Sequence, residues 1–178
     1  MTDPEALISR WKTEDGVRRR AAVLELLREK QPWSHVLEGF ERVDDDDIKH
    51  HEDLRGINLS GELLDGVELS FVTMSFAIFD GCRLVRAHFQ ATRLSNASFR
   101  RAILREATMT GLIADGACFD EADLRNAYLD AGVLRGASFR NSLFARTDLS
   151  RSDLVGATGV NWTGQNVDLY AAKFHDVA

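Results

Sequence analysis

The sequence predicts an all-β solenoid, a four-sided tube of stacked coils with a small α-helical region at its N-terminal end. From Leu54 to Leu154 a large apolar residue recurs at every fifth position, with Ala114 as the one exception. Small residues such as Ala97 stand two positions before most of these residues, and Gly or Asn, such as Asn96, stands two positions after many. A period of five fits neither a helix, at 3.6 residues per turn, nor a strand, at 2.0.

Each unit of five residues is predicted to form one side and one corner of the tube. A small and a large residue two positions apart both point inward from a short extended segment. Gly and Asn tolerate the positive φ of a tight turn, so they fit the corner. Leu112 is large where its partner Ala114 is small, which conserves the volume of that layer.

The number of sides follows from a longer period. An Ala-x-Phe pair recurs with a spacing of 20 residues, at Ala77/Phe79, Ala97/Phe99, Ala117/Phe119 and Ala137/Phe139. Four units therefore form one coil, and about six coils, each rising about 4.8 Å, would make a rod about 30 Å long. The four phenylalanines are expected to stack as a ladder inside the tube.

The chain is divided into three predicted segments. Residues 1–43 form a helical N-terminal cap, residues 44–53 an acidic connector, and residues 54–178 the β-helix. A solenoid needs covered ends, because a bare end exposes unpaired backbone groups. Whether the helices cover the β-helix or bind elsewhere is left open by the sequence.

The longer of the predicted helices runs from about Asp15 to Lys30, with Val17 and Leu24 on its apolar side. The apolar surface available for covering the β-helix is supplied by four residues: Leu7, Trp11, Leu24 and Leu27.

The five-residue pattern weakens at both ends of the β-helix. Glu52 and Glu62 occupy inward positions, and an unpaired buried carboxylate costs several kcal/mol, so the first coil is expected to be irregular or open to solvent beneath the helices. Gly159 and Gly164 fall where large residues belong. The last coil is therefore predicted to bulge there, with Leu169 and Phe174 closing it.

Segments such as "ADLRN", "ASFRN", "TDLSR" and "SDLVG" resemble the A(D/N)Lxx motif of the pentapeptide repeat family, over about residues 52–174. The resemblance implies a right-handed quadrilateral β-helix, and nothing in the motif is catalytic. Some members of this family resemble duplex DNA in width and negative charge, bind DNA gyrase or topoisomerase IV, and protect it from quinolones or other topoisomerase poisons.

Charge and composition restrict the partners. The chain carries 28 acidic and 22 basic residues, a net charge of −6, which argues against a general affinity for nucleic acid or anionic lipid and favours a basic protein partner. The start of the sequence lacks a signal-peptide pattern, and no stretch approaches the roughly 18 apolar residues of a membrane span. We expect a cytoplasmic protein and, given the resemblance, a bacterial one.

Residues that could carry chemistry are few and scattered. The segment "DDDDIKHHED", residues 44–53, could bind a metal ion, but its spacing matches no calcium or zinc pattern, and a solvated connector is favoured. Cys82 is expected to point into the tube and Cys118 outward, both reduced. No nucleophile with an orienting base is recognisable, so we expect neither an enzyme nor a cofactor.

The charges alternate in bands along the chain. Arg100, Asp120 and Arg140 share one twenty-residue column, which predicts ion pairs between coils. Arg105 and Arg125 have no acid between them in their column. The candidates for binding an acidic partner are Arg83, Arg86, Arg93, Arg100, Arg101, Arg105 and Arg125. The candidate acidic patch consists of Asp44, Asp45, Asp46, Asp47, Glu62, Asp65 and Glu68.

Three functional hypotheses follow. The leading one is a non-catalytic protein–protein interaction module built on the rigid β-helix. The second, taken from the resemblance, is a DNA mimic that binds a type II topoisomerase; the arginines from Arg83 to Arg105 count against it. The third is a structural rod, a homodimer joined end to end through Trp162, Tyr170 and Phe174 of the last coil.

Overall fold

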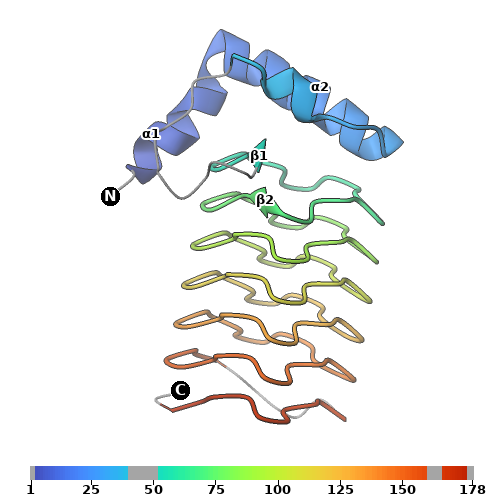
Figure 1. The fold of residues 1–178 in the computed structure, drawn as a ribbon, viewed down its shortest axis with the longest axis vertical. Coiled ribbons are helices and arrows are strands. Elements are labelled where there is room, and N and C mark those ends of the chain that lie inside the picture. Colours follow the sequence, from blue (N-terminus) through green and yellow to red (C-terminus); the bar gives the residue numbers. More distant parts are fainter. Residues whose placement is uncertain (1–2, 40–51, 160–165, 176–178) are drawn as a thin grey trace.

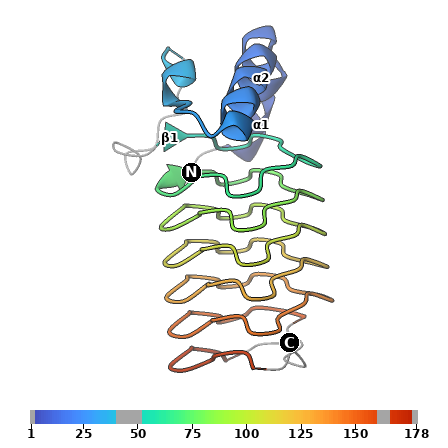
Figure 2. The ribbon, with the colours of Figure 1, turned by 90° about the vertical axis from the view of Figure 1, so that its right-hand side faces the viewer.

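The computed structural model describes residues 3–39, 52–159 and 166–175. Figure 1 shows a column of stacked coils with helices lying across one end and the C-terminal coil at the other, and Figure 2 shows the same arrangement from the side. The coils succeed one another in chain order from the helices downward, so residues far apart in sequence lie on neighbouring coils.

A parallel register of twenty residues joins the coils. Isolated bridges pair Asn58 with Ile78, Ile78 with Ser98, and so on to Thr158. Between coils, the Leu84 N–H donates to Ile103 O at 2.8 Å, and the Ile103 N–H donates to Cys82 O at 2.9 Å. The four-sided β-helix predicted from the period of five is therefore confirmed, while the count of about six coils stays a prediction.

Strand pairing is short because the chain turns after every triplet. The two strands long enough to be named are β1 (Glu52–Asp53) and β2 (Val72–Thr73), which pair in parallel in the first two coils. The β-helical register thus already includes Glu52 and Asp53. Of the predicted acidic connector, residues 44–51 lie outside the described residues.

The corners adopt the left-handed conformation that the sequence suggested. At one of them, the Ala87 N–H donates to Leu84 O at 3.1 Å, and Arg86 between them has φ of 57°. The same conformation occurs at bulky residues such as Phe71 and Glu106, where it costs about 1–2 kcal/mol. The next coil fixes the corner, since the Arg86 N–H also donates to Arg105 O at 2.9 Å.

The core is a column of inward side chains. The predicted aromatic ladder is present: Phe79, Phe99, Phe119 and Phe139 stack nearly parallel, with successive ring centroids 4.6, 5.0 and 5.1 Å apart. Phe89 adds an edge-on contact to Phe79 at 5.7 Å. All five rings are buried. The interior of the tube is therefore filled with side chains.

Leu112 is accommodated by the next coil as well as by its own layer. Gly132 lies twenty residues further on, and a Cβ there would approach Leu112 Cδ2 to 2.8 Å and the Leu129 carbonyl oxygen to 2.9 Å. The volume exchange therefore involves Ala114 within the coil and Gly132 on the neighbouring coil.

Within residues 3–39, the helical region consists of α1 (Pro4–Ser9), the 3₁₀ helix η1 (Arg10–Lys12), α2 (Glu14–Glu29) and the 3₁₀ helix η2 (Ser34–Leu37). Asp3 caps α1 by accepting a hydrogen bond from the Glu5 N–H at 3.0 Å. Thr13 caps α2 by accepting one from the Gly16 N–H at 3.0 Å.

The expected apolar residues Leu7, Trp11, Leu24 and Leu27 are all buried. Val17 is 56% exposed, so its predicted place on the apolar side is wrong. Trp11 and Arg10 fill the space between the start of α2 and the first coil instead.

A buried charge cluster fixes the helices to the first coil. Arg10, from η1, donates to both carboxylate oxygens of Asp53 at 3.0 Å, and Arg55 donates to the same carboxylate at 2.9 Å. The Trp11 indole N–H donates to Arg55 O at 2.8 Å. Gly56 lies so close to α1 that a Cβ would come within 2.7 Å of Leu7 O.

Glu62 finds its counter-charge in the helices. Its carboxylate pairs with Arg28 and, at 3.7 Å, with Arg20 of α2. The coil around it is regular, because the Leu64 N–H donates to Arg83 O at 2.8 Å. The expectation of an irregular first coil is therefore wrong at Glu62. Glu52, at the start of the coil, is exposed to solvent and does not point inward.

The twenty-residue register also holds in the last coil. Asp168 bridges to Asp148, and Lys173 bridges to Asp153. The predicted bulge falls mainly on residues 160–165, outside the described residues. Leu169 packs against the core, whereas Phe174 is 46% exposed, so it does not close the coil as expected.

Gly132→Ala should lower the free energy of unfolding by about 1–3 kcal/mol, because the new methyl group overlaps Leu112 and backbone. Urea denaturation measures the change. In a Leu112→Ala background the methyl group enters vacated space, so its cost should shrink. The same cost in both backgrounds would contradict the packing described here.

Asp53→Asn should lower the free energy of unfolding by about 3 kcal/mol at pH 7, because two arginines lose their buried counter-ion. Burial alone would raise the pKa of Asp53, but hydrogen bonds from Arg55 and Arg10 outweigh it and hold the pKa below its ordinary value. This stabilisation is complete above the unfolded-state pKa of about 3.9 and is lost as pH falls through the folded-state pKa.

The difference between wild type and Asp53→Asn should therefore shrink as pH is lowered from 7 towards 2.5, as measured by urea denaturation at each pH. The control is Asp15→Asn, which breaks exposed pairs with Arg18 and Arg19 and should cost less than about 1 kcal/mol. An equal cost for both variants would show that Asp53 does not anchor the helices.

Candidate interaction surface

One side of the column collects most of the candidate arginines. The bridges place Leu63, Arg83, Ile103, Asp123 and Leu143 in one outward row. We call this row, with the two lines of corners that flank it, the arginine face. It includes six of the seven candidates: Arg83 in the row, Arg100 and Arg101 along one edge, and Arg86, Arg105 and Arg125 along the other.

Arg93 is the exception, because it lies in the row of Thr73 and Ile113 on another side of the column. In the sequence, six of the candidate arginines lie close together, between positions 83 and 105. In the structure, the twenty-residue register places most of the candidates on one side of the column.

Ion pairs between neighbouring coils tether these arginines. Arg101 Nε lies 3.0 Å from Glu121 Oε2. The other pairs are Arg83 with Asp65 at 2.8 Å, Arg86 with Glu106 at 3.3 Å, and Arg100 with Asp120 at 3.5 Å. The last pair was expected from its column. The guanidinium groups are thus held in place by acids of the same rod.

Arg105 and Arg125 share an acid that lies outside their twenty-residue column and was not predicted from the sequence. Asp123 accepts from Arg105 Nε at 2.5 Å and from Arg125 Nη2 at 2.8 Å. The acid stands in the middle of a triplet, outside their twenty-residue column, and the long arginine side chains reach it diagonally. Arg135 reaches Asp153 in the same way, with Nε and Oδ2 2.8 Å apart.

Burial would raise the pKa of Asp123, but hydrogen bonds from Arg125 and Arg105 outweigh it and keep the pKa below its ordinary value. The carboxylate therefore stays charged at neutral pH. Its side chain is 12% exposed, against 48% for Arg105 and 37% for Arg125. The outermost charge at this point is positive.

Three members of the candidate acidic patch lie among the described residues. Glu62 pairs with α2, Asp65 pairs with Arg83, and Glu68 accepts the Ser70 N–H at 2.8 Å. Asp44, Asp45, Asp46 and Asp47 lie outside the described residues. The three described acids are engaged within the fold.

Many of the outward acids close corners. An Asp or Asn in the middle of a triplet accepts the backbone N–H two residues ahead, which is an Asx-turn. This occurs at Asp53, Asn58, Asp123, Asp148, Asp153 and Asp168. Asp or Asn at the middle position of a triplet therefore has a structural role that was not predicted from the sequence, although its place just before a corner was visible there.

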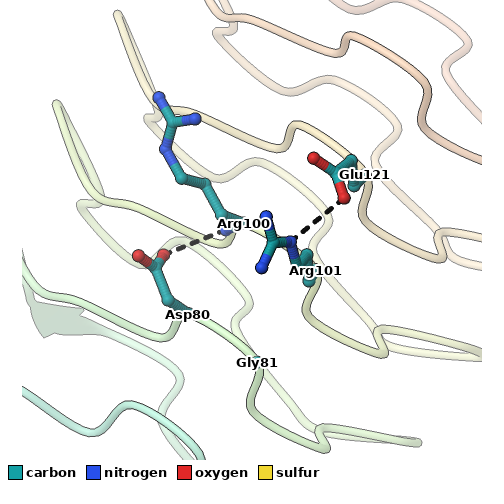
Figure 3. A pocket seen from close by; sticks show the side chains of 5 residues that line it. All are labelled: Asp80, Gly81, Arg100, Arg101 and Glu121. Atoms are coloured by element: carbon teal, nitrogen blue, oxygen red, sulfur yellow. Dashed lines mark hydrogen bonds and ion pairs between the residues drawn. The ribbon is translucent and has the colours of Figure 1, made fainter.

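A shallow cavity of about 300 Å³ opens along one edge of the arginine face, lined by Asp80, Gly81, Arg100, Arg101 and Glu121. Figure 3 shows Arg101 turned towards Glu121, while Asp80 accepts the Arg100 backbone N–H at 3.0 Å. Gly81 leaves the corner open because it has no side chain. The charged groups here are mainly one another's partners.

Apolar side chains lie along the middle of the arginine face. Leu63 is 69% exposed, Ile103 37% and Leu143 50%. These side chains were not among the residues predicted from the sequence, although their position between the small and the large residue of each unit identifies them as outward. Together with the arginines they give this side an apolar centre and a charged border.

Within residues 3–39, 52–159 and 166–175, no group of three or more His, Cys, Asp and Glu side chains is arranged to hold a metal ion. Cys82 points inward as expected, and its thiol donates to Leu59 O at 2.8 Å. Burial raises its pKa to about 11, so it stays protonated. No helix of these ranges is long and apolar enough to cross a membrane.

Of the candidate end contacts, Tyr170 is 78% exposed and Phe174 46% exposed on the C-terminal coil. Trp162 lies outside the described residues. The C-terminal coil, to which Tyr170 and Phe174 belong, lies at the end of the column opposite the helices (Figure 1).

Comparison with known families identifies the repeats. A family model described as pentapeptide repeats matches residues 82–120 and 122–158, with eight copies of the repeat. These residues belong to the continuous register described above. The matched residues are pentapeptide repeats, and the fold of that family is the right-handed quadrilateral β-helix.

Several solved structures are similar to this chain. A pentapeptide repeat protein, Rfr23, from the cyanobacterium Cyanothece 51142 is 21% identical, with 70% of this chain and 89% of that chain covered and a TM-score of 0.47. QnrB1, a plasmid-mediated fluoroquinolone resistance protein, is 18% identical, with coverages of 69% and 89% and a TM-score of 0.39.

A pentapeptide repeat protein from the thylakoid lumen of Arabidopsis thaliana is 24% identical, with coverages of 68% and 74% and a TM-score of 0.35. The sequence matches no curated protein.

Proposed function

We propose that this chain is a non-catalytic protein–protein interaction module, in which the β-helix is a rigid scaffold that presents the arginine face. The observation that carries the proposal is the convergence of Arg83, Arg101 and Arg125, with their neighbours, around an exposed apolar row. An apolar centre bordered by arginines is typical of protein interfaces, where aromatic residues, Met and Arg are enriched.

Preorganisation supports this role. Several arginines of this face are already held by an acid of the rod, for example Arg101 by Glu121 of the neighbouring coil, so little side-chain entropy is lost when a partner binds. A guanidinium group has five N–H donors. Those not used in the ladder remain available to a partner's carboxylates.

The filled interior argues against catalysis within the tube. Enzymes place substrates in concave pockets of about 300–1,000 Å³, whereas the rings of Phe99 and Phe119 leave no such space inside the coils. The cavity beside Gly81 lies on the surface and is lined by charges that engage one another. We place the module in the bacterial cytoplasm as part of the same proposal.

Affinity capture from the host's cytosolic extract tests the function. The chain, immobilised through a C-terminal tag, should retain a protein that excess untagged chain displaces, and the purified pair should bind directly in calorimetry. The control bait is the same chain unfolded by heat and re-immobilised. Recovery of no protein above that control, at several salt concentrations, would count against an interaction module.

Binding to a type II topoisomerase by DNA mimicry is a narrower alternative. It requires a continuous acidic face, and the described outward acids are interleaved with arginines, for example Arg100 beside Asp120. We therefore favour an acidic partner and expect no change in gyrase supercoiling or in quinolone sensitivity when the purified chain is added. Inhibition of supercoiling or protection from the drug would favour the topoisomerase instead.

End-to-end pairing of two copies is a second candidate, favoured by the exposure of Tyr170 and Phe174 on the terminal coil. Two such ends related by a two-fold axis would bury these rings against each other. Light scattering should then give a dimer mass that falls to the monomer mass in a Tyr170→Ser/Phe174→Ser variant. A monomer mass at every concentration would exclude the dimer.

A further inference from the structure

We infer that the arginine face docks one acidic amphipathic α-helix of a partner protein, with the helix lying along the axis of the column. The inference rests on the proposed function and specifies its occupant. Three features carry it: the spacing of the exposed apolar residues, the lines of arginines on both sides of them, and the exposure of the guanidinium groups relative to their acids.

The apolar residues stand on alternate coils. Leu63, Ile103 and Leu143 are separated by two steps of the bridge register each. Because neighbouring strands lie about 4.8 Å apart, successive apolar residues are about 10 Å apart along the column. The residues between them in the row are Arg83, whose Nη2 lies 2.8 Å from Asp65 Oδ2, and Asp123, which is paired with Arg105 and Arg125.

An α-helix matches this spacing. Seven residues of helix rise about 10.5 Å and make almost two complete turns, so residues at i, i+7 and i+14 lie on one side. An extended chain does not match this spacing. Residue i+3 is about 10 Å from residue i but points to the opposite face, whereas residues i+2 and i+4, which point to the same face as residue i, are about 7 and 13 Å away. Apolar residues seven apart on a helix therefore meet Leu63, Ile103 and Leu143 in turn.

The charges beside the apolar row select an acidic helix. Arg100 and Arg101 stand along one edge, and Arg86, Arg105 and Arg125 along the other. In the more asymmetric pairs the arginine is the exposed member: 58% for Arg100 against 10% for Asp120, and 48% for Arg105 against 12% for Asp123. Glu or Asp residues flanking the apolar stripe of a helix would meet these guanidinium groups on both sides.

A designed peptide tests the inference directly. The probe is a fluorescein-labelled, Ala-rich helical peptide, about four turns longer than the roughly 12–15 residues below which an isolated helix is marginal in water. It carries three leucines spaced seven residues apart, with glutamates on both sides of the leucine stripe. Two matched peptides of similar helicity serve as controls. One has the outer leucines exchanged with alanines on the opposite side, and the other has lysine in place of glutamate.

Fluorescence anisotropy should show saturable binding of the first peptide to the full chain. Each control peptide should bind about tenfold more weakly or worse, because it loses either two apolar contacts or the charge complementarity. Absence of saturable binding by the first peptide, or equal binding by the peptide with displaced leucines, would overturn the inference.

Variants of the chain locate the site. Leu63→Ser/Leu143→Ser and, separately, Arg101→Glu/Arg125→Glu should each weaken binding about tenfold. The apolar control is Val17→Ser/Tyr128→Ser, which removes side chains that are 56% and 52% exposed elsewhere. Circular dichroism and thermal denaturation should show that every variant is folded.

The charge control is Arg135→Glu/Arg151→Glu, at corners away from the arginine face. Both arginines are 62% exposed and are paired with Asp153 and Asp130 at 2.7 and 3.0 Å, so their reversal disturbs the ladder in a comparable way. Controls should stay within about twofold of wild type. An equal loss in controls and arginine-face variants would show binding by overall charge and contradict the assigned face.

The inference and the proposed function fail separately. If a host protein is captured equally well by wild type and by Leu63→Ser/Leu143→Ser, the chain is an interaction module that uses another surface, and this inference is wrong. Loss of capture in that variant, with capture retained by Val17→Ser/Tyr128→Ser, supports both.

Discussion

The parallel hydrogen-bond register between coils is the constraint on which the rest of the structure depends. It makes each residue the neighbour of the residue twenty positions on, so every outward or inward position becomes a continuous row. Inside, the rows are the phenylalanine ladder and its aliphatic counterparts; outside, they are ion-pair ladders and the arginine face. A shift of one residue in the register would turn inward side chains to solvent, so the apolar core and the outward rows depend on the same alignment.

The same register creates a problem at the ends of the column, where a coil has no neighbour to pair with. At the N-terminal end, α1, η1 and α2 lie over the first coil (Figure 2). Arg10, Asp53 and Arg55 form a buried ion-paired cluster there. Replacing an inward apolar residue by Glu62 is tolerated because α2 brings arginines to it. At the opposite end, Tyr170 and Phe174 remain accessible.

The repeat was readable from the sequence because it depends on local periodicity: the inward pairs, the corners and the Phe79 to Phe139 ladder all follow from positions counted by fives and twenties. Contacts that depend on side-chain reach were not. Asp123 lies outside the column of Arg105 and Arg125 and meets them only because arginines span the diagonal. The packing role of Gly132 could not be predicted for a similar reason, since the space that its missing side chain leaves is occupied by Leu112 of another coil. The arginine face itself was hidden by linear order, in which its members alternate with residues of other sides.

Pulsed electron paramagnetic resonance between spin labels at positions 63 and 143 tests the account most directly, in a chain whose Cys82 and Cys118 are replaced by alanine and serine. These positions are far apart in the sequence, but the register places them in one row, four bridge steps apart. A single-peaked distance distribution centred at about 19 Å is expected, with a width set by the label linkers. A broad distribution, or one centred well beyond 30 Å, would show that the coils do not stack in this register and that the arginine face does not exist as one surface.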